Sequence, residues 1–461
     1  MPVLKKRRRP VQPFRKPVKP VKDEEITSES DIEEDEVSPK QNVGLSGEDG
    51  SQDEEEAVDE KRARLTKKVL EAAAIREDRV GGGGVLEEED TEEEGEGEGD
   101  EVGVEERGMK EGVGSAGSDA GFVEKLKGFD GTDAVSWGEK RAHWLPVTCI
   151  AVGDNDNSVA VTGGKDSRIV VWDLNTGAAS RIFSPGEKGR NPGRTQGHVG
   201  DVLAVAVGEG GLIASGGRDG MVRVWDRRAK KQVDCLKGHR GLVGALAFRK
   251  GTKQLFSGST DRTVKIWELN EMAYVETLFG HGSEVNGLDS HVKERALSCG
   301  ADGTVRLYKV IESSQLVFRR ARTTSLDCVS MFSETRFFTG GDDGAVCLWQ
   351  ANKKKPVAVV EHSHGQGTGC EHWISCTATI QDSDIAISGA GDGTLKLWEC
   401  KEGGEVNAVT DINLGDGFIN GAAVCKNRNV IVAAVGQEHR RGRWSRLKKA
   451  RNSLAIVKLP Q

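Results

Sequence analysis

The stretch GHRGLVGALAFRKGTKQLFSGSTDRTVKIWELNEMAYVETLFGH, residues 238–281, decides the fold of this chain. It begins and ends with a Gly-His pair, and Ser257, Asp261 and Trp267 lie between them in alternating apolar and polar runs bounded by Gly. Alternation with a period of two residues, interrupted by turn residues, predicts short β-strands. One such unit cannot bury its apolar face alone, so the unit is expected to recur along the chain.

The unit recurs as a fixed pattern of Ser or Thr, three residues, Asp, five residues, and then Trp or Tyr. The six copies are Thr162-Asp166-Trp172, Ser215-Asp219-Trp225, Ser257-Asp261-Trp267, Ser298-Asp302-Tyr308, Thr339-Asp343-Trp349 and Ser388-Asp392-Trp398. Successive aromatic residues are 53, 42, 41, 41 and 49 positions apart. Such self-similarity is the signature of a repeat architecture.

The spacing within each unit predicts a small antiparallel sheet held by a chain of hydrogen bonds. The Asp lies in a tight turn between two strands and can hold the His of the preceding loop, while the Ser or Thr hydroxyl and the Trp indole extend the chain across the sheet. Three Gly-His pairs stand 21 or 22 residues before an Asp, and they contain His198, His239 and His281. We therefore expect these histidines to be structural and not catalytic.

The repeat closely resembles the WD-repeat family of β-propellers, whose repeats run about 40–45 residues. The resemblance implies an all-β fold, a seven-bladed WD40 β-propeller. Six blades carry the Asp register, and 418–434 with 453–459 supply strands of a seventh blade that lacks the Asp and the Trp. If Val457 stands at the Trp position, only four residues follow it. We expect a segment around 121–145 to supply the missing outer strand and so remove an exposed edge.

The charge divides the chain at about residue 120. Residues 1–120 carry 35 acids and 19 bases, a net charge of −16, whereas 121–461 carry 38 acids and 46 bases, a net charge of +8. The first part has few large apolar residues, so it cannot bury enough surface to offset the entropy of ordering. We expect a disordered charged tail over 1–120 and a propeller over 121–461.

The tail divides into segments of different composition. Residues 1–22 hold nine bases and no acid, and 23–60 and 87–111 are acidic. A short α-helix is expected over about 60–77, where Gly and Pro are absent and apolar residues fall at helical spacing. The basic cluster of the first segment is a candidate nuclear-localisation signal, formed by Lys5, Lys6, Arg7, Arg8 and Arg9.

Several function classes find no support in the sequence. No run approaches the roughly 20 consecutive apolar residues that cross a bilayer. The nine Cys are scattered and form no CxxC, which gives no zinc or redox motif. No nucleophile–base pairing occurs in a recognisable motif. We therefore expect no enzyme activity, no catalytic residues, no metal, no cofactor, no small-molecule substrate and no membrane association.

In the seventh blade an insertion, GQEHRRGRWSRLKKARN at 436–452, replaces the turn that elsewhere carries Asp. From His439 to Arg451 it holds seven Lys or Arg and no acid. The His–Asp pairing places this insertion on the same propeller face as bases of blades one to three. A basic face with an aromatic residue suits phosphate contacts and base stacking, although these residues do not distinguish RNA from DNA. The candidate RNA-binding residues are Arg440, Arg441, Arg443, Trp444, Arg446, Lys448, Lys449, Arg451, Lys165, Arg218, Arg240 and Arg262.

Residues 238–281 and VGQEHRRGRWSRLKKARNSLAIV at 435–457 resemble the WD-repeat protein family specific to the U3 small nucleolar ribonucleoprotein. SSQLVF at 313–318, HWIS at 372–375, DGFINGA at 416–422 and RARLTKKVLE at 62–71 also match its pattern. Ser445 departs from it, because a second aromatic residue is expected there.

The resemblance implies binding to U3 small nucleolar RNA together with the kink-turn-binding core protein of the particle. It also implies other partners in the small-subunit processome, a role in pre-ribosomal RNA processing, and a location in the nucleus and nucleolus.

A different class remains open on the sequence alone. Trp225-Asp226-Arg227-Arg228 fits the W-D-x-R pattern of substrate receptors of cullin–RING ubiquitin ligases. Four residues within a WD repeat match such a pattern by chance often, so the pattern is much less specific than the 435–457 stretch.

Overall fold

The computed structural model describes residues 122–127, 129, 134–139, 142–153, 158–187, 193, 195–320, 325–365, 372–401, 403–425 and 430–460. The expected tail over 1–120, its helix over about 60–77 and its basic cluster Lys5–Arg9 lie outside these residues. The described part of the chain is almost entirely β-structure, with one short helix at 122–126. No helix in it is long and apolar enough to cross a membrane.

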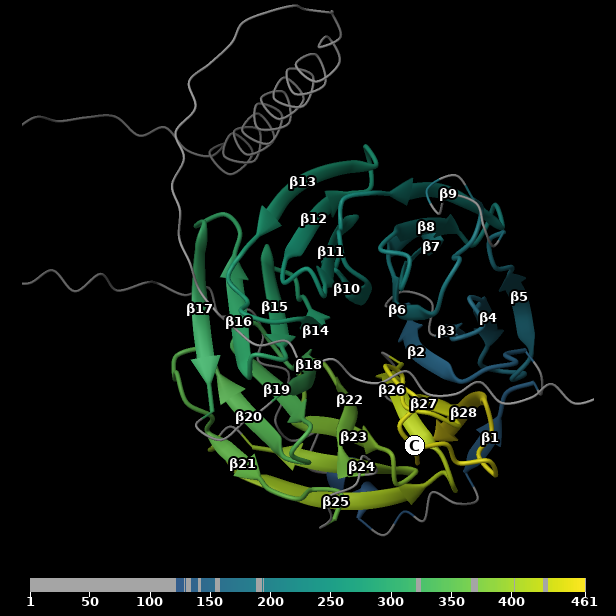
Figure 1. The fold of residues 1–461 in the computed structure, drawn as a ribbon. Coiled ribbons are helices and arrows are strands. Elements are labelled where there is room, and N and C mark those ends of the chain that lie inside the picture. Colours follow the sequence, from purple (N-terminus) through teal and green to yellow (C-terminus); the bar gives the residue numbers. More distant parts are fainter. Residues whose placement is uncertain are drawn as a thin grey trace, which may run out of the picture. The chain divides into compact units, whose positions relative to one another are not determined.

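The strands form seven four-stranded antiparallel sheets, which confirms the seven-bladed propeller (Figure 1). Blade one contains β2 (Val147–Val152), β3 (Val159–Gly164), β4 (Ile169–Asp173) and β5 (Ala179–Phe183). Blade two contains β6 (Val202–Val207), β7 (Leu212–Gly217), β8 (Val222–Asp226) and β9 (Lys231–Leu236), with a 3₁₀ turn at Glu209–Gly211. Blade three contains β10 (Val243–Phe248), β11 (Gln254–Ser259), β12 (Val264–Glu268) and β13 (Ala273–Leu278).

The remaining blades follow in chain order. Blade four contains β14 (Val285–Asp289), β15 (Arg295–Gly300), β16 (Thr304–Lys309) and β17 (Ser314–Arg319). Blade five contains β18 (Leu326–Met331), β19 (Arg336–Gly341), β20 (Val346–Gln350) and β21 (Ala358–Val360). Blade six contains β22 (Ile374–Thr379), β23 (Ile385–Ala390), β24 (Thr394–Cys400) and β25 (Val406–Asn413). Blade seven contains β26 (Phe418–Val424), β27 (Val430–Gly436), β28 (Ser453–Lys458) and β1 (Val135–Trp137).

The innermost strands of successive blades lie beside one another, and β26 of blade seven lies beside β2 of blade one, so the ring closes. A cavity of about 160 Å³ runs at its centre and is lined by these innermost strands from all seven blades.

The outer strand of blade seven comes from the N-terminal side, as the sequence predicts. In Figure 1, β1 lies against β28 of the last blade. Val135 pairs with Val457, and Ile431 pairs with the same residue on its other side. Val457 thus occupies the position that Trp267 holds opposite Leu255 in blade three. The edge that β28 would otherwise expose is covered.

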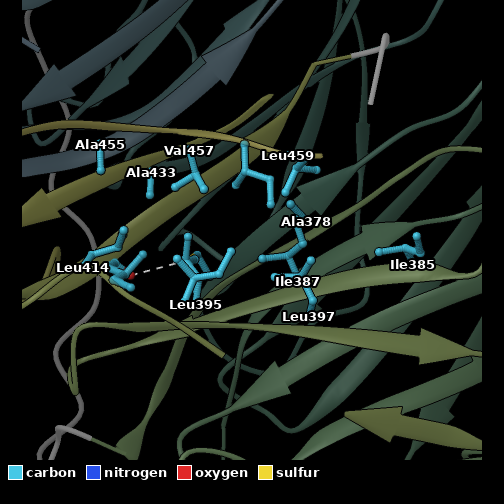
Figure 2. Packing of buried hydrophobic residues seen from close by; sticks show 14 of the residues in the cluster. Ala378, Ile385, Ile387, Leu395, Leu397, Leu414, Ala433, Ala455, Val457 and Leu459 are labelled. Atoms are coloured by element: carbon cyan, nitrogen blue, oxygen red, sulfur yellow. Dashed lines mark hydrogen bonds between the residues drawn. The ribbon is translucent and has the colours of Figure 1, made fainter. Parts of the chain in front are cut away.

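The segment before β1 also packs into the ring. Val123 and Leu126, on the short helix at 122–126, are fully buried against a cluster shared by blades six and seven. Figure 2 shows part of this cluster, in which Ile387 and Leu395 of blade six lie near Val457 and Leu459 of blade seven. The N-terminal segment therefore joins the two blades by apolar packing as well as by strand pairing.

The hydrogen bonds from His to Asp and from His to Ser that the sequence predicts are present in the three Gly-His blades. In blade three, His239 Nδ1 lies 2.8 Å from Asp261 Oδ2, and its Nε2 lies 2.7 Å from Ser257 Oγ. The indole Nε1 of Trp267 donates to the same hydroxyl at 2.8 Å. His198 and His281 make the equivalent contacts with Asp219 and Asp302.

Two further blades have the same chain without a Gly-His pair. His143 contacts Asp166 and Thr162 in blade one, and His364 contacts Asp392 and Ser388 in blade six. The sequence did not reveal them because His143 follows Ala and His364 stands 28 residues before its Asp. In blade five Arg320 takes the place of His and donates to Asp343 at 2.7 Å.

Candidate nucleic-acid interface

The insertion in blade seven, here called the basic loop (residues 437–452), is closed at its base by its own polar groups. The backbone N–H of Gln437 donates to Asn452 Oδ1 at 2.9 Å, across the two ends of the loop. The side chain of Asn420, on the innermost strand β26, donates to the carbonyl oxygens of Val147 and Glu438. The loop therefore leaves the blade in a defined direction, on the face that carries the His–Asp pairs.

Arg440 fastens the basic loop to the far side of the ring. Its Nη2 donates to the carbonyl oxygens of Asn286 in blade four at 3.1 Å and Asp327 in blade five at 2.8 Å. The guanidinium group also lines the central cavity. Arg440 therefore reaches from blade seven across the channel mouth. Its guanidinium group is hydrogen-bonded to backbone carbonyl oxygens of the protein.

Glu438 is the acid around which the bases of the loop are arranged. The side chains of Lys165 and Glu438 are 4% and 9% exposed, and Lys165 Nζ lies 3.1 Å from Glu438 Oε2. Lys165 also donates to the carbonyl oxygen of Gly442 at 2.9 Å. Arg443 Nε approaches Glu438 Oε2 at 3.4 Å, and Arg446 Nε approaches its Oε1 at 3.9 Å. Lys165 is thus buried under the loop, with its charge paired to Glu438. The carboxylate of Glu438 also offsets part of the positive charge of the loop.

Two aromatic side chains of the loop, His439 and Trp444, pack against each other and against Trp373. The ring of His439 lies 5.5 Å from that of Trp444 and 6.0 Å from that of Trp373, which precedes β22. Trp373 and Trp444 meet edge to face at 5.7 Å. Burial, together with the charges of Arg440, Arg441 and Lys165, lowers the pKa of His439 to about 3. His439 is therefore neutral at physiological pH and acts as an apolar support.

Acidification is expected to loosen the basic loop through His439. Its pKa is about 3 when folded and about 6.5 when unfolded, so the unfolded form binds more protons between these values and stability falls as pH drops below about 6.5. At about 1.4 kcal/mol per pH unit, the loss at pH 5 approaches about 2 kcal/mol. Protection factors of the loop amides at pH 7 and pH 5, obtained by hydrogen exchange and corrected for the intrinsic exchange rate at each pH, measure this loss. His439→Phe should remove the pH dependence of the protection factors. An equal pH dependence in both proteins would contradict the assignment.

The outer surface of the loop presents bases and one large aromatic ring. The side chain of Arg443 is 72% exposed and that of Arg446 is 60% exposed. Trp444 is 63% exposed. Lys448, Lys449 and Arg451 are exposed as well. Arg441 is mostly buried, and its Nη1 lies 3.8 Å from Glu284 Oε2 of the connection into blade four. Five of the seven bases in the loop therefore face solvent.

Bases from blades two and three extend this surface. Arg218, Arg240 and Arg262 are exposed and lie next to the His–Asp contacts of their blades. Arg218 Nε lies 3.4 Å from Asp201 Oδ2, while the guanidinium remains about half exposed. Exposed ion pairs of this kind are weak, so the charge stays available to an anionic partner.

The alternative ligase motif lies elsewhere. Trp225 is buried and donates to Ser215 Oγ, and Asp226 accepts hydrogen bonds from the backbone N–H groups of Arg228 and Ala229. Arg228 is exposed in the turn between β8 and β9, on the face opposite the basic loop. Trp225 and Asp226 are therefore accounted for by hydrogen bonds of the blade itself.

No group of residues able to hold a metal ion occurs within the described ranges. The thiols there are poor nucleophiles, because burial raises the pKa of Cys149 to about 11 and that of Cys328 to about 12. The exposed chemistry of the ring is therefore concentrated in the basic loop and the bases near it.

The fold and the loop define a WD-repeat propeller with a basic insertion across the channel mouth. The WD domain, G-beta repeat family matches residues 138–173, 190–226, 230–268, 272–309 and 363–399. The chain is 37% identical over 326 residues to U3 small nucleolar RNA-interacting protein 2 of Homo sapiens, covering 69% of this chain and 68% of that protein.

A more distant relative is ribosomal RNA-processing protein 9 of Saccharomyces cerevisiae, which is 26% identical over 351 residues, covering 60% of this chain and 61% of that protein. A solved structure described as that of U3-55K superposes with a TM-score of 0.66 at 37% identity, covering 71% of this chain and 99% of that chain. The chain belongs to the family of U3 small nucleolar ribonucleoprotein-associated WD-repeat proteins.

Proposed function

We propose that this chain is a non-enzymatic scaffold component of a U3 small nucleolar ribonucleoprotein and that it binds U3 RNA through the basic loop. The observation that carries the proposal is the exposed set of bases around Trp444, held over the channel mouth by Arg440 and Lys165. Because the loop is fastened at several points, its charges are pre-organised, which reduces the entropy lost on binding. The names of the relatives, which refer to U3 RNA and to ribosomal RNA processing, support the same role.

Each part of this face has a distinct proposed role. Arg443, Arg446, Lys448, Lys449 and Arg451 contact phosphates, and Trp444 stacks on an unpaired base. Arg218, Arg240 and Arg262 follow the backbone of the RNA away from the loop. Lys165, Arg440 and Arg441 act indirectly, because their partners are protein groups that fix the loop.

The wider assignment follows from membership of the family. We propose that the chain acts in pre-ribosomal RNA processing for the small subunit, in the nucleolus, with the kink-turn-binding core protein and other small-subunit processome proteins as partners. The basic cluster Lys5–Arg9 is proposed as the nuclear-localisation signal.

Reversing charge at Arg443, Lys448 and Lys449 to Glu is expected to weaken binding of a U3 RNA transcript at least tenfold, because phosphate contacts dominate affinity for nucleic acid. The slope of affinity against salt should also become shallower. Filter binding with the full chain over a series of salt concentrations measures both quantities.

The matched control reverses Lys353, Lys354 and Lys355, which are exposed in the turn between β20 and β21 on the opposite face. Both variants change the net charge by the same amount, so a difference between them reports position and not charge. Equal affinity of the loop variant and the wild type, with both folded, would refute the proposal.

A further inference from the structure

A second feature lies where the ring closes, beside the basic loop but separate from its tip. A cavity of about 620 Å³ is lined by Trp137 and Gly138 at the end of β1, by His143 and Trp144 before β2, and by Arg451, Asn452 and Ser453 at the end of the loop. We call it the seam pocket. Its volume falls in the range of small-ligand sites.

The walls of the seam pocket combine two indole rings with the side chain of Arg451, and a second arginine lies against one of the rings. Trp144 is 67% exposed, and the guanidinium carbon of Arg168 lies 3.7 Å from the centre of its ring. The guanidinium carbon of Arg451 lies 5.0 Å from the ring centre of Trp137. Two tryptophans, each with an arginine over it, therefore border one opening. Two indoles that border one opening offer surface for stacking, so this arrangement points to a ligand with a flat ring.

Hydrogen bonds hold the residues on both sides of the pocket. The backbone N–H of Trp144 donates to Asp166 Oδ2 at 3.0 Å, and His143 bonds the same carboxylate. On the other side, Ser453 Oγ donates to the carbonyl oxygen of Gly138 at 3.3 Å, and Gly138 N–H donates to Leu454 O at 2.9 Å. The two tryptophans are thus held by the hydrogen-bond chain of blade one and by the closing strand, and ligand binding requires little reordering.

The charge of the pocket favours an anionic ligand. Arg451 lines the pocket and Arg168 lies against the Trp144 ring, while the carboxylate of Asp166 is already satisfied by His143 and Trp144. Glu139, the nearest acid along the chain, is exposed and accepts a hydrogen bond from the Ala179 N–H. A flat ring with an attached phosphate fits both the indole surface and the positive charge of the pocket. The ring stacks on Trp144, and the phosphate contacts Arg451.

We propose that the seam pocket captures one unpaired nucleotide of the RNA that the basic loop binds. The proposal rests on the proposed function, because Arg451 and Asn452 belong to the loop itself, so RNA on the loop continues to the pocket. The base lies on the open face of the Trp144 indole, opposite Arg168. Stacking of a base on an aromatic side chain contributes about 1–3 kcal/mol.

The test is Trp144→Ala in the full chain, with binding to a U3 RNA transcript measured over several salt concentrations. Loss of about 1–3 kcal/mol of stacking corresponds to an affinity about 5- to 150-fold weaker. The slope against salt should stay at the wild-type value, because no phosphate contact is removed. Trp144→Phe should retain most of the affinity. Ile311→Ala, which truncates an exposed apolar residue in the turn between β16 and β17 on the opposite face, is the control and should bind as the wild type does.

The outcomes separate this inference from the proposed function. If Trp144→Ala binds RNA as the wild type does while the loop variant is impaired, the seam pocket takes no nucleotide and the loop proposal stands. If neither variant is impaired, both proposals are wrong. Cross-linking with a photoreactive uridine in the transcript gives a direct readout: the expected adduct lies on the peptide containing Trp144, and adducts confined to the loop tip would overturn the inference.

Discussion

Replacing Glu438 with alanine is expected to destabilise the anchored loop by about 3–5 kcal/mol, because it leaves the buried ammonium group of Lys165 without its partner. Lys165 would retain a hydrogen bond to Gly442 O, which does not balance its charge. Arg443 and Arg446 would lose their shared carboxylate at the same time. Faster hydrogen exchange at loop amides, with unchanged exchange in the strands of blade two, is the expected signature.

The matched experiment is a double-mutant cycle. Lys165→Met leaves Glu438 with the exposed Arg443 and Arg446, which can still hold its charge, so a smaller loss is expected. Lys165→Met together with Glu438→Leu removes both charges and should recover much of the stability, because replacing a buried ion pair by apolar groups is often neutral. Additive losses in the double variant would show that the pair is not coupled and that the loop is held by other contacts.

These variants are expected to separate loop anchoring from the proposed RNA binding. The double variant keeps every exposed base of the loop, so its RNA affinity should stay close to the wild-type value if the loop remains ordered. Glu438→Ala should bind RNA less tightly in spite of its higher positive charge, because the bases lose their fixed arrangement. A higher affinity for Glu438→Ala would show that charge alone, without geometry, governs binding.

Removing residues 1–139 is expected to have the largest effect on the stability of the ring. Val123 and Leu126 are fully buried, and the burial of two such side chains contributes about 3–6 kcal/mol. The pairing of β1 with β28 is lost as well, which leaves β28 as an open edge that can recruit another chain. We expect a lower midpoint in urea and a tendency to self-associate, measured by denaturation and light scattering.

Removing residues 1–121 is the matched control, since it keeps the packed segment and β1. Its unfolding midpoint should equal that of the full chain. The point variant Gly138→Val tests the closure of blade seven without truncation. A Cβ at Gly138 would lie 2.6 Å from Cζ3 of the buried Trp172, so the substitution should force this ring to move. If the 1–139 deletion unfolds at the same midpoint as the 1–121 deletion, the closing strand does not stabilise the ring.

The ring of blades could be predicted from the sequence because the residues that define each blade lie close together in the chain. Ser257, Asp261 and Trp267 lie within ten residues of one another, and the same register appears in six blades. The strand that closes the ring could also be predicted, because the four residues after Val457 are too few to form an outer strand. His143 and His364 were missed because neither follows a Gly, and because they stand 23 and 28 residues before their Asp instead of 21 or 22.

The fine structure of the site could not be predicted in this way. The sequence shows seven bases in the loop, but it does not show which of them are exposed. Arg440 bonds carbonyl groups that lie 154 and 113 residues away in the chain, and Lys165 reaches Glu438 across 273 residues. These contacts depend on how the closed ring brings blades together. The seam pocket likewise forms only when the segments around Trp144 and Arg451 meet.

The pairing of β1 with β28 also imposes an order on biosynthesis. Chains emerge from the ribosome N-terminus first, and contacts between distant segments form late. β1 must therefore wait, unpaired, until residues 453–458 have been made, and the basic loop just before them gains its frame at the same moment. A nascent or interrupted chain that stops before β28 can hold six blades yet lacks the assembled surface. The proposed RNA-binding surface is therefore complete only after β28 has been made.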